Sequence, residues 1–279
     1  MKIHHLNCGT MCPAARRFVD GEGSLLESTK MVCHCLLVET HDGLLLVETG
    51  LGHDDVTQGS RRLGRLFTWV TRARLDPEET AVAQVKRLGY RVEDVRHIVL
   101  THGHCDHAGG IADFPKARIH LYAPELQSMT EPYSRKNPAI YHRVQWAHGP
   151  DFVGHALQGD DFRGFSAVRP LPNLDIDVAL IPLPGHTRGH AAVLIATGER
   201  TLLHAGDLYN HRYQLHDAGN PTPHGMNLFQ RIVDWNTKER IANLARLREL
   251  HESAADIEVF CAHDAVEFDQ VSASVVATL

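Results

Sequence analysis

Three histidines and an aspartate lie within six residues, directly after the apolar run Ile98-Val99-Leu100. They are His102, His104, Asp106 and His107. Imidazole and carboxylate groups bind zinc, iron or manganese while leaving coordination positions open for water. Alternate side chains of an extended segment point the same way, so the first two histidines can reach one ion, and the pair one turn further on can reach a second. A histidine-rich surface loop is the simplest alternative, but such a loop has no reason to follow the pattern of a buried strand.

Each of three later predicted strands also ends at a possible ligand. The strands are expected at 176–182, 201–205 and 257–261, and the residues that follow them are His186, Asp207 and His263. A lone histidine at a strand end is more often a polar surface residue than a ligand. Four such segments together indicate one site, because ligands carried on the ends of different strands are held accurately by the scaffold.

The other elements are placed by hydrophobic periodicity and turn residues. Further strands are expected at 2–7, 31–40, 43–48, 96–101, 118–122 and 191–197, with one helix opening at Asp76 and another at about 237–251. Asn236 followed by Glu239 is typical of a helix start, and leucines at helical spacing form the buried side of that last helix. A chain of 279 residues suits one large domain or two small ones.

Residues 124–172 show little regular pattern and are rich in aromatic residues and prolines. We expect this stretch to be an insertion that covers the site, since it has no repeating pattern of its own. Its aromatic residues are expected to wall an apolar substrate pocket; they are Tyr133, Tyr141, Trp146, Phe152 and Phe162. Packing of the insertion onto the body is the alternative role for them.

The composition limits the classes of partner. A net charge of −6, from 28 Lys+Arg and 34 Asp+Glu, disfavours a polyanionic partner such as RNA. Six cysteines are too few for a disulfide scaffold in a chain of this length. The first residues lack the apolar core of a signal peptide, and no run of about 18 apolar residues could span a bilayer. We therefore expect a cytoplasmic protein with a small-molecule substrate and with neither a nucleic-acid nor a membrane partner; the oligomeric state is not indicated.

The pattern of ligands strongly resembles the signature of the metallo-β-lactamase fold superfamily, over nearly the whole chain. The matching residues are His102-x-His104-x-Asp106-His107, His186, Asp207 and His263. The resemblance implies a single α/β domain over residues 1–279, with the insertion at about 124–172 covering the active site. Its fold would be an αββα four-layer sandwich, in which two mixed β-sheets pack face to face with helices outside and the metals at one edge.

By the same resemblance we expect two divalent metal ions, zinc in the first place, with iron, manganese or cobalt as alternatives. One ion would be held by His102, His104 and His186 and the other by Asp106, His107 and His263, with Asp207 as the bridge. The charge of such a site lowers the pKa of a bound water, so that metal-bound hydroxide can attack a carbonyl group. Glu48 stands where the superfamily usually has a ligand-supporting aspartate. Cys105 is expected to be a packing residue and His190 a structural one.

Within the superfamily the chain is most similar to the lactonase-like branch, which includes N-acyl homoserine lactonases. Pro184-Gly185-His186-Thr187 and Cys261-Ala262-His263-Asp264 carry this similarity. Those lactonases place a substrate-binding tyrosine three residues after the bridging aspartate, whereas here Tyr209 comes two residues after it and Asn210 occupies the third position. The resemblance predicts hydrolysis of a lactone or small ester. The candidate catalytic residues are Asp106 and Tyr209, and the candidate substrate-binding residues are Trp146, Phe152 and His211.

Three other functions are compatible with parts of the pattern. A glyoxalase II-like thioester hydrolase fits the ligands, but no clear basic patch for glutathione lies near the C-terminus. A mononuclear-iron persulfide dioxygenase uses fewer ligands than this chain has. A non-enzymatic metal-dependent sensor or interaction protein has no need to keep every ligand, and here all seven are present.

Overall fold

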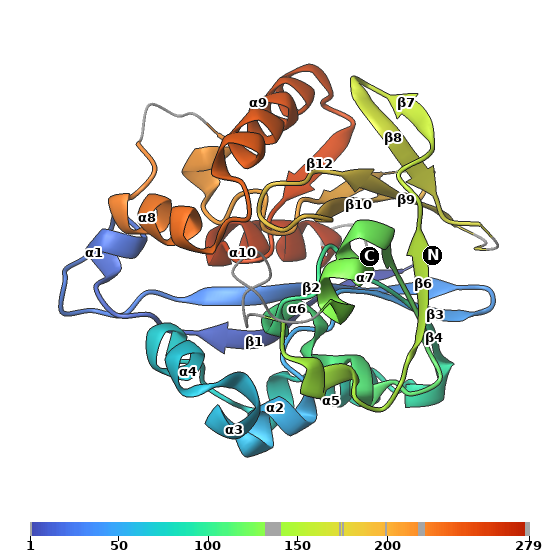
Figure 1. The fold of residues 1–279 in the computed structure, drawn as a ribbon, viewed down its shortest axis with the longest axis horizontal. Helices are drawn as coiled ribbons and strands as arrows, with labels where there is room; N and C mark the ends of the chain where they lie inside the picture. Colours follow the sequence, from blue (N-terminus) through green and yellow to red (C-terminus); the bar gives the residue numbers. More distant parts are fainter. Residues whose placement is uncertain are drawn as a thin grey trace.

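The computed structural model describes residues 2–131, 141–172, 174, 176–198, 200–216 and 221–276. In this part of the chain two six-stranded sheets lie face to face, with most of the helices on their outer sides (Figure 1). The first sheet has the strand order β1-β2-β3-β4-β5-β6, and the second has the order β12-β11-β10-β9-β8-β7. This arrangement confirms the predicted αββα sandwich.

The first sheet comes from the first half of the chain. Its strands are β1 (Ile3–Met11), β2 (Met31–Thr40), β3 (Gly43–Val47), β4 (Val95–Val99), β5 (Arg118–Tyr122) and β6 (Asp151–His155). β1, β2 and β3 pair antiparallel, and β3 to β6 pair in parallel. The accompanying helices are α1 (Arg16–Val19), α2 (His53–Gln58), α3 (Ser60–Leu63), α4 (Arg65–Thr71), α5 (Ala81–Arg87), α6 (Cys105–Ala108) and α7 (Ala123–Thr130).

The second sheet comes from the second half of the chain. Its strands are β7 (Asp160–Phe162), β8 (Phe165–Pro170), β9 (Asp177–Pro182), β10 (Ala191–Ala196), β11 (Thr201–His204) and β12 (Ile257–Phe260). β11 and β12 pair in parallel, and the other neighbours pair antiparallel. The helices are α8 (His224–Val233), α9 (Thr237–Ser253) and α10 (Ala265–Val276). No helix within the described ranges is long and apolar enough to cross a membrane.

Alternation along the strands explains why the sheets stack. On β2, Leu36 and Val38 belong to the core between the two sheets, whereas Cys35 and Leu37 belong to the core under the outer helices. The sheets are also joined by a hydrogen-bonded side chain: the Tyr122 hydroxyl donates to the carbonyl oxygens of Ala167 at 2.7 Å and Leu180 at 3.1 Å. The two sheets therefore meet at a defined relative position.

The predicted strands are confirmed, with the bounds of β2 and β5 as expected and that of β1 extended to Met11. The helix predicted to open at Asp76 is divided in two. The Asp76 carboxylate caps the short 3-10 helix Pro77–Glu79, and Thr80 then caps α5.

The lack of regular structure expected for 124–172 is contradicted in the described residues, whereas the covering of the site by this stretch stays a prediction. β6 is the edge strand of the first sheet, and β7 and β8 form the edge of the second. These strands are short and mostly half-exposed, so their sequences lack the continuous apolar character of central strands.

The structure places three of the predicted aromatic residues in core contacts, and the ring of a fourth, Tyr141, lies 5.4 Å from that of His104. Trp146 lies in the core of the first sheet, with Phe152 packed against the same core, and Phe162 packs against the core of the second sheet. Tyr133 lies outside the described residues. Trp146 and Phe152 therefore make core contacts, and their part in substrate binding stays a prediction.

Truncation of Trp146 to alanine should consequently destabilise the fold. We expect Trp146→Ala to lower the free energy of unfolding by about 3–5 kcal/mol, because a large buried side chain is replaced by a cavity. Urea denaturation measures the difference. Trp69→Ala is the matched control, since Trp69 on α4 is 76% exposed, and its change should stay within about 0.5 kcal/mol. A stable Trp146→Ala protein with a raised KM would contradict the packing role.

Candidate metal centre

The histidine motif begins where β4 ends and runs into the short helix α6. His102 and His104 lie on the extended segment before the helix, and Asp106 and His107 lie on its first turn. His186 follows β9, Asp207 follows β11 and His263 follows β12. Both sheets therefore deliver side chains to the same edge.

All seven predicted ligands come together there. Three groups have ligand atoms that lie within 4.8 Å of one another: His102, His104 and His186; His102, His107 and Asp207; and Asp106, His107 and His263. The Asp207 carboxylate lies between the two sets. Its Oδ2 is 3.3 Å from His186 Nε2, and its Oδ1 is 3.3 Å from His107 Nε2 and 3.1 Å from His263 Nε2.

The donor atoms have the properties that a metal ion requires. Among the described residues, several buried atoms of the cluster have no hydrogen-bond partner in the protein; they are the Nε2 atoms of His102, His104 and His107 and Oδ1 of Asp207. Buried polar atoms are normally paired, because leaving one unpaired is costly. Nitrogen and carboxylate donors that converge in this way fit a divalent ion.

Electrostatics favour the matching protonation states. Burial, followed by the neighbouring imidazoles, holds the pKa of His102 and His104 well below the usual value. Burial would raise the pKa of Asp207, but His263, His107 and His186 outweigh it and hold that pKa well below its usual range. Burial would lower the pKa of His107, but the carboxylates of Asp207, Glu48 and Asp106 hold it well above. Asp207 is thus ionised, His102 and His104 are neutral, and His107 keeps a proton that a bound cation would displace.

Glu48 supports the cluster from behind, as the resemblance implied. Its Oε2 accepts from His107 Nδ1 at 3.0 Å, and its Oε1 accepts from the Thr101 backbone N–H at 2.5 Å. The Glu48 backbone has a φ of 62°, in the left-handed region that is rare for residues other than glycine. The backbone thus turns locally so that the glutamate can contact both groups.

Other ligands are held in the same way. The His263 Nδ1 donates to the Val32 carbonyl at 2.7 Å, which leaves Nε2 to face Asp207. His186 Nδ1 lies 3.5 Å from the buried Asp234 carboxylate.

His190 is structural, as expected: it donates through Nδ1 to Leu183 and accepts from the Asp207 backbone N–H through Nε2. Cys105 is buried in a small apolar cluster and is a packing residue.

Glu125 is a buried carboxylate that sequence reasoning missed. It accepts hydrogen bonds from Gly103 N–H and the Tyr141 hydroxyl on one oxygen, and from the Thr187 hydroxyl and Gly189 N–H on the other. Burial raises the pKa of Glu125, and these four hydrogen bonds partly oppose that shift. It ties the motif to the loop that carries His186. The available signal is its position three residues after the strand 118–122, which is one more strand end followed by an acidic residue.

Tyr209 does not face the cluster. Its side chain is fully buried in the core of the second sheet, and its hydroxyl donates to the Glu267 carboxylate at 3.1 Å. This placement contradicts the expectation that it stabilises a charged substrate oxygen. His211 is also engaged within the protein, since its Nε2 lies 3.1 Å from Asp20 Oδ1 and its Nδ1 accepts from the Tyr213 N–H. It does line a cavity beside His263, so its placement near the substrate stays a prediction.

A four-layer α/β sandwich with a buried histidine and aspartate cluster at one sheet edge is the arrangement of a metal-dependent hydrolase. The chain belongs to the metallo-beta-lactamase superfamily, whose family model matches residues 28–253. It is 44% identical over 265 residues to a probable metallo-hydrolase of Mycobacterium tuberculosis, across 95% of this chain and 80% of the relative. The protein is thus a hydrolase of this superfamily.

Lactonases are among the more distant relatives. An N-acyl homoserine lactonase from Bacillus cereus is 27% identical over 169 residues, across 61% of this chain and 60% of the relative. The structure of an N-acyl homoserine lactone hydrolase with N-hexanoyl-L-homoserine at its catalytic metal centre superimposes with a TM-score of 0.69, at 21% identity over 96% of this chain and 95% of that one. The dizinc lactonase AidC superimposes with a TM-score of 0.60, at 18% identity over 95% of this chain and 90% of that one. At these identities the structural likeness concerns the fold.

Replacement of Glu48 should weaken metal binding. In Glu48→Gln, one of the two carboxylate oxygens becomes an NH2 group that faces a donor, either His107 Nδ1–H or Thr101 N–H. We expect metal affinity to fall by about 10- to 100-fold, the usual effect of removing a group that orients a ligand. Chelator competition measures the affinity. Glu78→Gln is the control, because its side chain is 79% exposed, and unchanged affinity in Glu48→Gln would contradict the supporting role.

Proposed function

We propose that the protein binds two divalent metal ions, zinc in the first place, and hydrolyses a lactone or small ester. One ion would be held by His102, His104 and His186 and the other by Asp106, His107 and His263, with Asp207 between them. The observation that carries this proposal is the Asp207 carboxylate, whose two oxygens face histidines of different groups.

Bound divalent ions would supply Lewis acidity and lower the pKa of coordinated water. The protein's own contribution is to hold the donor set rigid. Glu48 fixes the ring of His107, the Val32 carbonyl fixes that of His263, and Glu125 fixes the two loops against each other. Such preorganisation matters because a misplaced reacting group loses much of its rate advantage.

Asp106 is suited to proton transfer. Its side chain is 14% exposed, whereas those of Asp207, His107 and His263 are at most 6% exposed. Its carboxylate is therefore the one that a substrate can reach most directly. In hydrolysis, water adds to the carbonyl carbon, the carbon–oxygen bond to the alkoxy group breaks, and the alkoxide takes a proton; Asp106 would carry that proton between the two oxygens.

The lactone or ester class is supported by the relatives. Proteins described as N-acyl homoserine lactonases match more than half of this chain, and solved lactonases share its fold along nearly the whole length. A carbonyl substrate also suits the chemistry of the site, since no separate protein nucleophile is needed when a metal ion activates water.

A substrate panel with matched variants tests this function. Zinc-loaded protein should turn over γ-lactones and small esters faster than thioesters or phosphoesters, and a chelator should abolish the turnover until zinc is restored. His186→Ala should reduce kcat/KM at least about 100-fold. His148→Ala is the control, because this histidine is exposed and distant in sequence from the motif segments, and it should leave kcat/KM unchanged. Brisk thioester cleavage without lactone or ester turnover would refute the substrate class.

A further inference from the structure

Exposed apolar side chains gather on three segments of the chain. Among the described residues fifteen large apolar side chains are exposed, and ten of them belong to residues 18–26, 66–70 and 228–235. The most exposed of the ten are Leu26, Leu66, Trp69 and Ile232, which are 72% to 98% exposed. Single exposed apolar residues are ordinary, but a gathering of them in one region usually marks a surface that binds a partner.

The three segments are neighbours in the fold. α1, α4 and α8 lie toward one end of the molecule, on the left in Figure 1. The Phe18 ring of α1 packs against Gly225 of α8, where a Cβ would come within 2.5 Å of the ring. The Arg72 guanidinium at the end of α4 donates to Ser28 Oγ at 3.2 Å, which joins α4 to the segment that carries α1. We call residues 16–30, 60–74 and 224–235 together the end surface.

Positive charge on the end surface is left without partners. Six exposed cations there form no ion pair with any described residue; they are Arg17, Lys30, Arg61, Arg65, Arg72 and Arg231. Residues 60–74 contain no aspartate or glutamate. Asp234 is the only acidic residue of 224–235, and it is buried and paired with Arg240 at 2.9 Å. This end of the molecule is therefore basic, although the whole chain has a net charge of −6.

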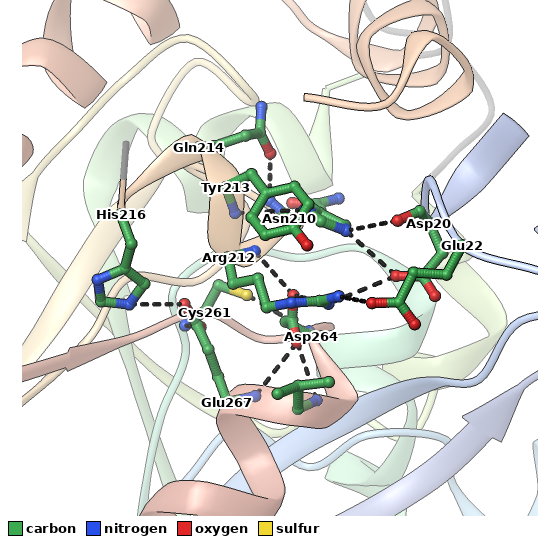
Figure 2. Close-up of polar contacts among 12 residues, drawn as sticks. Asp20, Glu22, Asn210, Arg212, Tyr213, Gln214, His216, Cys261, Asp264 and Glu267 are labelled. Carbon is green, nitrogen blue, oxygen red and sulfur yellow. Dashed lines mark hydrogen bonds and ion pairs between the residues drawn. The ribbon is translucent and has the colours of Figure 1, made fainter. Parts of the chain in front are cut away.

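The acidic residues of the α1 segment are held by two arginines. Arg16 lies within 3.6 Å of the carboxylates of Asp20, Glu22 and Glu27. Figure 2 shows the Arg212 guanidinium beside the first two of these carboxylates, at 3.4 Å and 2.9 Å. Each acidic side chain of the end surface thus has a cationic partner, whereas the six cations do not have an anionic one.

We propose that the end surface docks on a bilayer of anionic phospholipid as a peripheral contact. Exposed apolar side chains can enter the boundary between head groups and acyl chains, while arginine and lysine side chains bind the phosphates. Trp69 and Trp235 both lie on this surface, and tryptophan is favoured at that boundary because its ring is amphipathic. Such a contact requires neither a helix that spans the membrane nor a positive net charge.

Other occupants fit the end surface less well. A second copy of the chain would bring the six unpaired cations toward those of its partner, since a two-fold interface pairs a surface with itself. RNA would be attracted by the cations, but its affinity comes mainly from phosphate contacts and does not use aliphatic side chains such as Leu26, Leu66 and Ile232. An anionic bilayer offers a partner to both kinds of side chain.

Docking in this way would bring the metal centre close to the lipid. The cavity beside His263 is lined in part by Arg16, Lys30 and Met226 of the end surface. Arg212 also lies 3.3 Å from Asp264, the residue after His263, so the α1 segment is tied to the turn that carries this ligand. The cavity would therefore open near the bilayer surface. Docking on lipid goes beyond the proposed reaction and does not depend on it.

Sedimentation with sucrose-loaded vesicles tests the contact. The zinc-loaded protein should bind vesicles of equal parts phosphatidylglycerol and phosphatidylcholine at least about 10-fold more strongly than vesicles of phosphatidylcholine alone, and less strongly as salt is raised. Leu66→Ser combined with Ile232→Ser should weaken the binding about 10-fold or more. Leu88→Ser combined with Leu157→Ser is the matched control, because these side chains are 40% and 51% exposed on other segments, and it should leave the binding unchanged.

Tryptophan fluorescence identifies the part of the protein that enters the lipid. The chain has three tryptophans; Trp69 and Trp235 are exposed on the end surface, and Trp146 is buried in the core of the first sheet. Anionic vesicles with brominated acyl chains should quench the wild-type protein. Trp69→Phe combined with Trp235→Phe should still bind these vesicles but lose the quenching, because only the buried ring remains. Quenching that persists in this variant would overturn the proposal.

The remaining outcomes also decide. No binding to anionic vesicles, or equal binding by the Leu66→Ser and Ile232→Ser double variant, would overturn the proposal. Tight binding of single-stranded RNA without vesicle binding would assign the end surface to nucleic acid instead. A dimer in sedimentation equilibrium that the same double variant dissociates would assign it to a second copy, and either result would overturn docking on lipid.

Discussion

The interaction on which this structure depends is the burial of the Asp207 carboxylate among histidines from three other segments. A buried charge is tolerated only when opposite charges or hydrogen bonds compensate for lost water. Here His263, His107 and His186 hold the pKa of Asp207 well below its usual range, against the effect of burial. The Asp207 backbone N–H donates to His190 Nε2 at 3.0 Å, which holds the backbone that carries this carboxylate.

The cluster forms because the two sheets are stacked so that strands of both end at the same edge. β4 belongs to one sheet and β9, β11 and β12 to the other, yet the residues after all four strands reach the same place. Two buried carboxylates secure this meeting: Glu48 binds the segment that follows β4, and Glu125 ties that segment to the loop after β9. Gly189 permits the second contact, because a Cβ there would lie 2.1 Å from the Glu125 nitrogen. The contacts of Glu48 and Glu125 thus hold the metal ligands in place and also join the two sheets.

Much of this arrangement could be predicted from the sequence, for a physical reason. The motif from His102 to His107 is contiguous in the sequence, so these ligands could be predicted. Central strands are continuous apolar runs, so the α/β sandwich could be predicted as well. Tertiary packing decided the rest. Nearness to Asp207 in sequence makes Tyr209 a candidate for substrate binding, but its side chain turns into the core and its hydroxyl donates to Glu267. Glu125 is recognisable only when the four donors around it are seen, and the edge strands β6 and β8 carry too weak a pattern to be distinguished from loop.

The central claim is that the buried cluster holds two metal ions bridged by Asp207. Anomalous X-ray diffraction from crystals of zinc-loaded protein, collected on both sides of the zinc absorption edge, tests it directly. The account predicts two separate anomalous peaks, one among His102, His104 and His186 and one among Asp106, His107 and His263, with the Asp207 carboxylate between them. A single peak at full loading, or peaks that lie away from Asp207, would contradict it.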